Sequence, residues 1–275
     1  MDCQPRRAPR QSLSSRVLST FLAAAICLFG GQVAAQTLIK LEKRHVKWGA
    51  LAYGTGADVT YTYLRQPLAD PGARNCRRML PLQFALEPSD VSHAAFDREV
   101  RRAFALWSEV ADIRFREVRD LRDAEIIIGA QAEPRGIAYV NVTLGEHRSA
   151  DISQLTRSTI CLNPLVTWTK LNDGDPLTYH VRRVIAHEIG HAIGLDHDGP
   201  EGGLMGYRYV ENATTPVAEL SASDIRGIQT LYGPVDTAPA TTLVAERAPA
   251  KRPSAEGRAN AGRALVPAPL PAMLP

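Results

Sequence analysis

The chain has 275 residues, of which 45% are hydrophobic and 22% charged, and its formal net charge is +3. The stretch of about 200 residues between its two atypical ends is long enough for one domain with a sizeable core. A net charge this small does not indicate a nucleic-acid groove. Beyond the N-terminal segment, no apolar run is long enough to span a bilayer.

The first 35 residues have the pattern of a signal peptide. Arginines at 6, 7, 10 and 16 precede a mostly apolar run over 17–29, and the small residues 33–35 favour cleavage before Gln36. The apolar run is shorter than the roughly 20 residues that a membrane-spanning helix needs. We therefore expect residues 1–35 to be removed, and the mature protein to be secreted, periplasmic or extracellular and free of the membrane.

The first half of the mature chain alternates between strand and helix patterns. Phe96 to Val110 carries apolar side chains at helical spacing, which predicts an amphipathic helix with a buried face. The segment 65–88 contains several Pro and Gly residues and is expected to be a long loop. Strands are predicted at 59–64, 113–118, 124–129, 137–142 and 159–162.

The second half predicts two helices and then a change of composition. The first should run from about 177 to 193, and the second starts at a capping box of Ser221 with Asp224 and stops at Gly233. This order of elements predicts an α+β domain over residues 36–235. Residues 236–275 are rich in Ala and Pro and lack aromatic residues, so we expect a disordered tail.

Export would leave two cysteines in the mature chain. Cys3 and Cys27 lie in the predicted signal peptide, so Cys76 and Cys161 remain as an even pair in an oxidising compartment. We predict a Cys76–Cys161 disulfide. The alternative is a pair of buried free thiols.

The residue run 187–205, HEIGHAIGLDHDGPEGGLM, carries the strongest chemical signal. His187 and His191 are four residues apart, so on a helix they lie one turn above the other and both imidazoles can reach one metal ion. Gly194 allows the chain to leave the helix and bring His197 back as a third ligand. Three protein ligands with an open fourth position are typical of a catalytic zinc site.

Glu188 follows the first histidine and can project toward a zinc-bound water without ligating the metal. Zinc lowers the pKa of its water to about 7, and Glu188 is our candidate general base. The alternative for Glu188 is an ordinary carboxylate on the helix surface. A lone HExxH arises by chance, but the extended set of five residues makes the zinc site the better interpretation.

With these residues, the chain resembles the matrixin branch of the metzincins, the zinc endopeptidases related to matrix metalloproteases and their bacterial relatives. Four segments between about 46 and 234 carry the resemblance: the zinc run, 220–233, 100–107 with 113–115, and Trp48 with 59–63. The resemblance implies a zincin-like fold with a twisted, mostly parallel sheet, an active-site helix and a C-terminal helix. It also implies that Met205 forms the Met-turn, which is the better interpretation of this residue than an ordinary core methionine, and that the strand near 136–139 pairs with a peptide substrate.

The chain also departs from the family pattern. The sequence before Trp48 has no PRCG-like cysteine switch, and His147 with Asp151 is all that suggests a second, structural zinc. Calcium is a further cofactor that the resemblance allows without naming its ligands. We expect Asp198 to tie down the turn after the third histidine. Tyr207 could assist at the zinc or simply pack.

The sequence therefore predicts an exported zinc metalloendopeptidase with His187, His191 and His197 as zinc ligands and Glu188 as general base. Its expected partners are protein or peptide substrates, with no nucleic acid and no membrane, and it is expected to be a monomer. One alternative is a catalytically silent, zinc-holding protein that binds polypeptides. The other is a zinc amidase that acts on cell-wall peptides.

Overall fold

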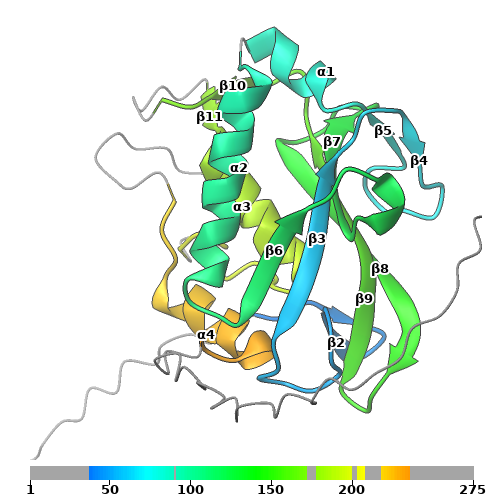
Figure 1. Ribbon diagram of the computed structural model, residues 1–275, viewed down its shortest axis with the longest axis vertical. Helices are drawn as coiled ribbons and strands as arrows, with labels where there is room; N and C mark the ends of the chain where they lie inside the picture. The colour runs from blue at the N-terminus through cyan, green and yellow to red at the C-terminus, as the bar shows by residue number, and fades with distance from the viewer. Residues whose placement is uncertain (1–36, 90, 172–177, 200–202, 208–217, 236–275) are drawn as a thin grey trace, which may run out of the picture. The chain divides into compact units, whose positions relative to one another are not determined.

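A computed structural model describes residues 37–89, 91–171, 178–199, 203–207 and 218–235, and Figure 1 shows their arrangement. The predicted signal peptide 1–35 and the predicted tail 236–275 lie outside these residues. In the part of the chain that is described, no helix combines the length and the apolar character that crossing a membrane requires.

Most of the described strands form one mixed sheet in which parallel pairs dominate. Strand β9 pairs in parallel with β2 and β7, and β3 pairs in parallel with β7 and β6, whereas β1–β2, β4–β5, β5–β7 and β8–β9 are antiparallel. The strands are β1 (Lys40–Leu41), β2 (Arg44–Lys47), β3 (Ala57–Tyr63), β4 (Leu68–Ala69), β5 (Arg78–Leu80), β6 (Ile113–Glu117), β7 (Ile126–Gln131), β8 (Ala138–Arg148) and β9 (Ile152–Leu162). A separate parallel pair consists of β10 (Thr167–Thr169) and β11 (Thr178–His180).

The two long helices pack on each other and on one face of the sheet (Figure 1). The helices are α1 (Gln83–Leu86), α2 (His93–Ser108), α3 (Val181–Ala192) and α4 (Ala222–Tyr232), with 3-10 turns at Glu87–Ser89 and Leu121–Asp123. Helix α2 buries Phe96, Val100 and Trp107 as its spacing predicts, and the Trp107 indole donates to the Ala186 carbonyl on α3 at 3.0 Å. The predicted α+β class with a mostly parallel sheet, an active-site helix and a C-terminal helix is confirmed.

Three local predictions differ from the structure. Helix α3 begins at Val181 rather than near 177, because the His180 side chain caps it by accepting from Arg182 N while 178–180 forms β11. Strands β8 and β9 are longer than predicted. The prediction stopped short because the residues nearest the β8–β9 connection are mostly polar and do not alternate cleanly between apolar and polar. The expected loop 65–88 contains β4, β5 and α1.

The Cys76–Cys161 disulfide is confirmed. It joins the β4–β5 region to the end of β9 within a small second apolar cluster that includes Leu64, Met79 and Ile127. The crosslink closes a long loop, so the chain-entropy account assigns it about 4 kcal/mol of stabilisation.

Lys47 is a fully buried lysine at the end of β2. Its ammonium donates to the carbonyl oxygens of Trp48 at 3.0 Å, Ala50 at 2.6 Å and Thr55 at 3.2 Å, and lies 5.0 Å from the centre of the Tyr232 ring on α4. Burial lowers the pKa of Lys47 to about 8. The side chain thus fastens the loop after β2 beneath the C-terminal helix.

Replacing Lys47 by methionine should destabilise the fold by about 1–3 kcal/mol, because three carbonyl oxygens would lose their donor while the stem still fills the space. Denaturant unfolding measures this change. Lys40→Met, at an exposed position on β1, is the matched control and should change the unfolding free energy by less than about 0.5 kcal/mol. Equal effects of the two substitutions would contradict this role for Lys47.

Candidate metal centre

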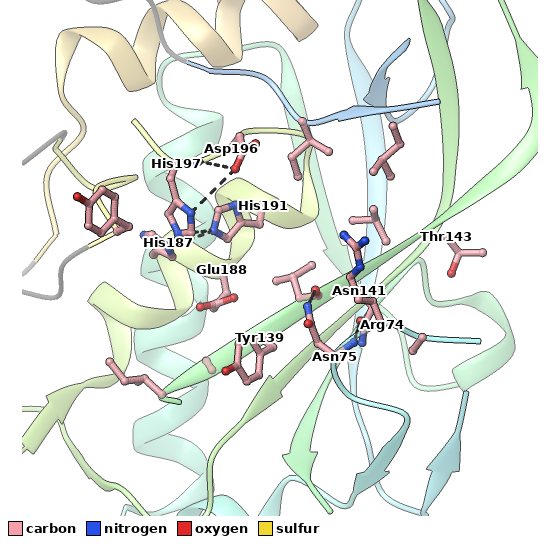
Figure 2. A pocket seen from close by; sticks show the side chains of 18 of the residues that line it. Arg74, Asn75, Tyr139, Asn141, Thr143, His187, Glu188, His191, Asp196 and His197 are labelled. Atoms are coloured by element: carbon pink, nitrogen blue, oxygen red, sulfur yellow. Dashed lines mark hydrogen bonds and ion pairs between the residues drawn. The ribbon is translucent and has the colours of Figure 1, made fainter. Parts of the chain in front are cut away.

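Three histidines from one helix and the loop that follows it meet at a single point. His187 and His191 lie one turn apart on α3, and His197 returns from the loop (Figure 2). Their Nε2 atoms are separated by 3.1 Å, 3.2 Å and 3.3 Å. The structure therefore brings together all three predicted ligands. Among the described residues, these three histidines form the one group of side chains placed to hold a metal ion.

Backbone carbonyls determine which ring nitrogens carry protons. His187 Nδ1 lies 2.7 Å from Leu204 O, and His191 Nδ1 lies 2.8 Å from Leu195 O. Because a carbonyl oxygen only accepts, each Nδ1 must donate. Burial lowers the pKa of His187 to about 4 and of His191 to about 3, so both rings are neutral near pH 7 and their Nε2 atoms carry lone pairs.

The three nitrogen atoms fit a zinc ion. Lone pairs that converge with no proton between them repel one another, and a bound cation removes that repulsion. Tetrahedral coordination with Zn–N distances of 2.0–2.1 Å places ligand nitrogens about 3.3 Å apart, which matches the observed separations. The Leu204 and Leu195 carbonyls are the outer hydrogen-bond partners that orient metal-binding imidazoles.

The loop that carries His197 is held by the N-terminal segment of the described chain. Thr37 O accepts from Asp196 N at 2.8 Å, Ile39 N donates to Gly194 O at 2.9 Å, and Leu38 forms an antiparallel bridge with Leu195. Sequence reasoning missed this contact, because pairing between backbone groups far apart in the chain leaves no side-chain pattern.

Glu188 is buried next to the histidines and lines the same cleft. Figure 2 shows its carboxylate below the three imidazole rings. Burial raises the pKa of the Glu188 carboxyl to about 8 when no cation is present. The interpretation of Glu188 as an ordinary surface carboxylate is therefore wrong.

Leu204 connects the histidine site to α4. Met205 is fully buried, and Leu204 N donates to the buried Asp224 carboxylate of α4 at 3.0 Å. The capping box of Ser221 with Asp224 is confirmed. Asp198 accepts a hydrogen bond from the Ser223 hydroxyl, so it does tie this turn to α4.

The remaining candidates lie apart from the three histidines or at their margin. His147 is exposed on β8, and neither it nor Asp151 belongs to a cluster of metal-ligand side chains among the described residues. Tyr207 is 54% exposed, so it is not a packing tyrosine, and its ring centre lies 6.3 Å from that of His197.

The histidines and Glu188 open onto a cavity of about 1160 Å³. One wall is β8, which pairs only with β9 among the described strands and is therefore an edge. The others are the β1 turn, the loop around Arg74, the side of α3 that carries the histidines and the turn at 204–207. An edge strand beside a cleft can pair with an extended peptide.

The lowered histidine pKa values predict how protons compete with zinc. His187 and His191 stay neutral down to pH 5, so acid should displace the metal mainly through the exposed His197. Between pH 6 and pH 5 the zinc Kd should rise by no more than about tenfold, because one proton competes with the metal. Three exposed histidines would bind three protons, and the zinc Kd would then rise by close to a thousandfold. Chelator competition measures this, and a rise of a hundredfold or more would contradict the prediction.

Comparison with known proteins identifies the architecture. The matrixin family model matches residues 77–233. Interstitial collagenase of Oryctolagus cuniculus is 31% identical over 53% of this chain and 30% of its own length, and metalloendoproteinase 1-MMP of Arabidopsis thaliana is 33% identical over 49% and 37%. Hatching enzyme of Paracentrotus lividus is 30% identical over 54% and 24%. The chain thus spans well under half the length of these relatives, and its matched region, which contains the three histidines and Glu188, shows that it belongs to the matrixin family.

Proposed function

We propose that the protein is a zinc-dependent endopeptidase that hydrolyses peptide bonds in polypeptide substrates. His187, His191 and His197 are the zinc ligands and Glu188 is the general base. The observation that carries this proposal is the convergence of three Nε2 lone pairs beside a buried carboxylate at the wall of an open cleft. Relatives named collagenase and metalloendoproteinase support the same activity.

When bound, zinc supplies Lewis acidity: it lowers the pKa of a water at the open position to about 7 and polarises the peptide carbonyl. Glu188 holds and moves the proton. A nearby cation favours the ionised carboxylate and offsets the burial that otherwise raises its pKa. Glu188 can then take a proton from the attacking water and return it to the leaving nitrogen.

The other residues bind and orient. The outward-facing backbone groups of β8 can pair with an extended substrate and hold its scissile bond over the histidines. The Leu204 and Leu195 carbonyls fix the rings, and the Thr37–Ile39 segment fixes the loop that carries His197. Tyr207, at the margin of the cleft, is available to contact the substrate.

The proposal includes export. Residues 1–35 act as a signal peptide, 36–235 form the catalytic domain and 236–275 form a tail, and the mature protein acts outside the cytoplasm as a monomer. The disulfide supports this location, because such crosslinks persist in oxidising compartments. Calcium stays a prediction with no residue assigned to it.

The test is hydrolysis of casein or gelatin by the purified 36–275 protein beside Glu188→Ala, with zinc measured on both. We expect cleavage by the wild type, and a loss of about a thousandfold or more in the variant while about one zinc per chain stays bound. Zinc on both proteins with no cleavage of proteins would favour the polypeptide-binding alternative. Cleavage of cell-wall peptides alone would favour the amidase.

A further inference from the structure

A second cavity, of about 210 Å³, adjoins the proposed catalytic cleft. Arg74, Asn75 and Tyr139 line both cavities, so the two are neighbours. In Figure 2, Tyr139, Asn75 and Arg74 lie beside β8 on the side of the cleft away from the histidines. The small cavity therefore borders the β8 side of the cleft, opposite the histidines.

The lining of this cavity is strongly basic. It contains four arginines and, among its described residues, the single acid Glu133; the arginines are Arg74, Arg77, Arg78 and Arg135. Arg78 pairs with Glu133 at 2.7 Å, and Arg77 donates to Ala73 O at 3.3 Å. Within the described part of the chain, the guanidinium groups of Arg74 and Arg135 have neither a hydrogen bond nor an ion pair. The cavity thus has a local charge of about +3 and two arginines free to bind an anion.

The residues that hold these arginines form a rigid frame. The Cys76–Cys161 disulfide fastens the loop to β9, and Asn75 N donates to Asn141 Oδ1 on β8 at 2.9 Å. Gln131 accepts from Arg135 N at 2.6 Å and pairs with Met79 across β5–β7. A frame fixed before binding loses little conformational entropy when a ligand binds.

The same loop contacts the free edge of β8 at Val140. Ile137 O accepts from Asn163 N, so by alternation the backbone groups of Ala138 and Val140 point away from β9. Asn75 Nδ2 donates to Val140 O at 3.1 Å. A peptide that pairs along β8 therefore meets Asn75 at Val140, next to Arg74 in the chain.

We propose that this arginine cavity binds acidic side chains of the polypeptide substrate, on one side of the scissile bond. The proposal rests on the proposed function and adds a substrate class to it: polypeptides with an acidic segment a few residues from the cleavage point. The family match begins at residue 77, so Arg74, Asn75 and Cys76 lie outside it. Two charge-assisted contacts at a part-exposed site should raise kcat/KM about five- to tenfold at low salt.

The test compares peptides that share one cleavable core. One carries a Glu segment on the N-terminal side, one carries it on the C-terminal side, and a Gln-substituted peptide serves as the neutral reference. The proteins are the wild-type 36–275 chain, the double variant Arg74→Ala/Arg135→Ala, and the control Arg98→Ala/Arg116→Ala. The control removes two exposed arginines that lie on α2 and β6 and line neither cavity.

We expect one of the two acidic peptides to be cleaved five- to tenfold better than the neutral peptide by the wild type and by the control, and no better by the Arg74/Arg135 variant. High salt should reduce the preference. Equal cleavage of all three peptides by the wild type would overturn the proposal, as would equal losses in the two double variants.

A second readout does not depend on cleavage. Fluorescence anisotropy measures binding of the labelled acidic peptide to Glu188→Ala with and without the two arginine substitutions. Arg-dependent binding without any proteolysis would support the acidic-segment site while refuting the proposed peptidase. Proteolysis by the wild type together with peptide binding that does not depend on the two arginines would support the proposed peptidase and refute the acidic-segment site. Binding of heparin, but not of the peptide, that depends on the two arginines would refute a polypeptide as the ligand of the cavity.

Discussion

His191→Ala is expected to lose the zinc and, with it, all measurable peptide hydrolysis. His191 Nε2 lies 3.1–3.2 Å from both other Nε2 atoms, and among the described residues the cluster holds no fourth metal-ligand side chain to replace it. Two remaining imidazoles hold zinc far more weakly than three. We expect less than about 0.1 zinc per chain after dialysis and a fall in kcat/KM of a thousandfold or more. Atomic absorption with a peptide assay measures both quantities.

The control is His147→Ala, an exposed histidine on β8 outside the cluster. It should keep the metal and the activity of the wild type. Removal of zinc from the wild type with a chelator, followed by its return, should abolish and then restore hydrolysis. Full activity in His191→Ala would contradict the assignment of this ligand.

Gly194→Ala is expected to destabilise the fold strongly and to weaken zinc binding. Gly194 has φ of 108°, which an alanine adopts only under strain, and its added Cβ would overlap the Val46 carbonyl oxygen on β2. Strain and overpacking together should cost about 3–5 kcal/mol and lower Tm by about 10 °C. Because the loop from Gly194 carries His197, the zinc Kd should rise as well. Calorimetry and chelator competition measure the two effects.

Gly199→Ala is the matched control, since it lies in the same loop with φ of 72° but has open space around the position of a Cβ. It should cost only about 1 kcal/mol. Similar losses in the two variants would show that backbone conformation alone, and not the contact with β2, explains the effect of Gly194→Ala.

The ligand set could be predicted because its geometry is local. A spacing of four residues places His187 and His191 on one helix face whatever the rest of the fold is, and a glycine after the helix allows a return to His197. The capping box at Ser221 and the buried face of α2 are local in the same sense. The disulfide could be predicted from the number of cysteines, because removal of the predicted signal peptide would leave only Cys76 and Cys161.

The parts that sequence reasoning missed depend on contacts between distant segments. Nothing in the sequence shows that Thr37 pairs with the loop carrying His197, or that the Leu204 carbonyl orients His187, because backbone groups are alike at every residue. The arginines of the second cavity come from two separate stretches, around 74–78 and at 135, and only the fold brings them together. The β4–β5 pair was hidden by the Pro and Gly residues around it.

The most direct test is the location of zinc in a crystal of the zinc-loaded protein by anomalous scattering at the zinc edge. We predict one strong peak at about 2.0–2.1 Å from the Nε2 atoms of His187, His191 and His197, with no protein atom at the fourth position and Glu188 beside it. A peak elsewhere, or a fourth protein ligand that closes the site, would contradict a catalytic zinc centre in this protein.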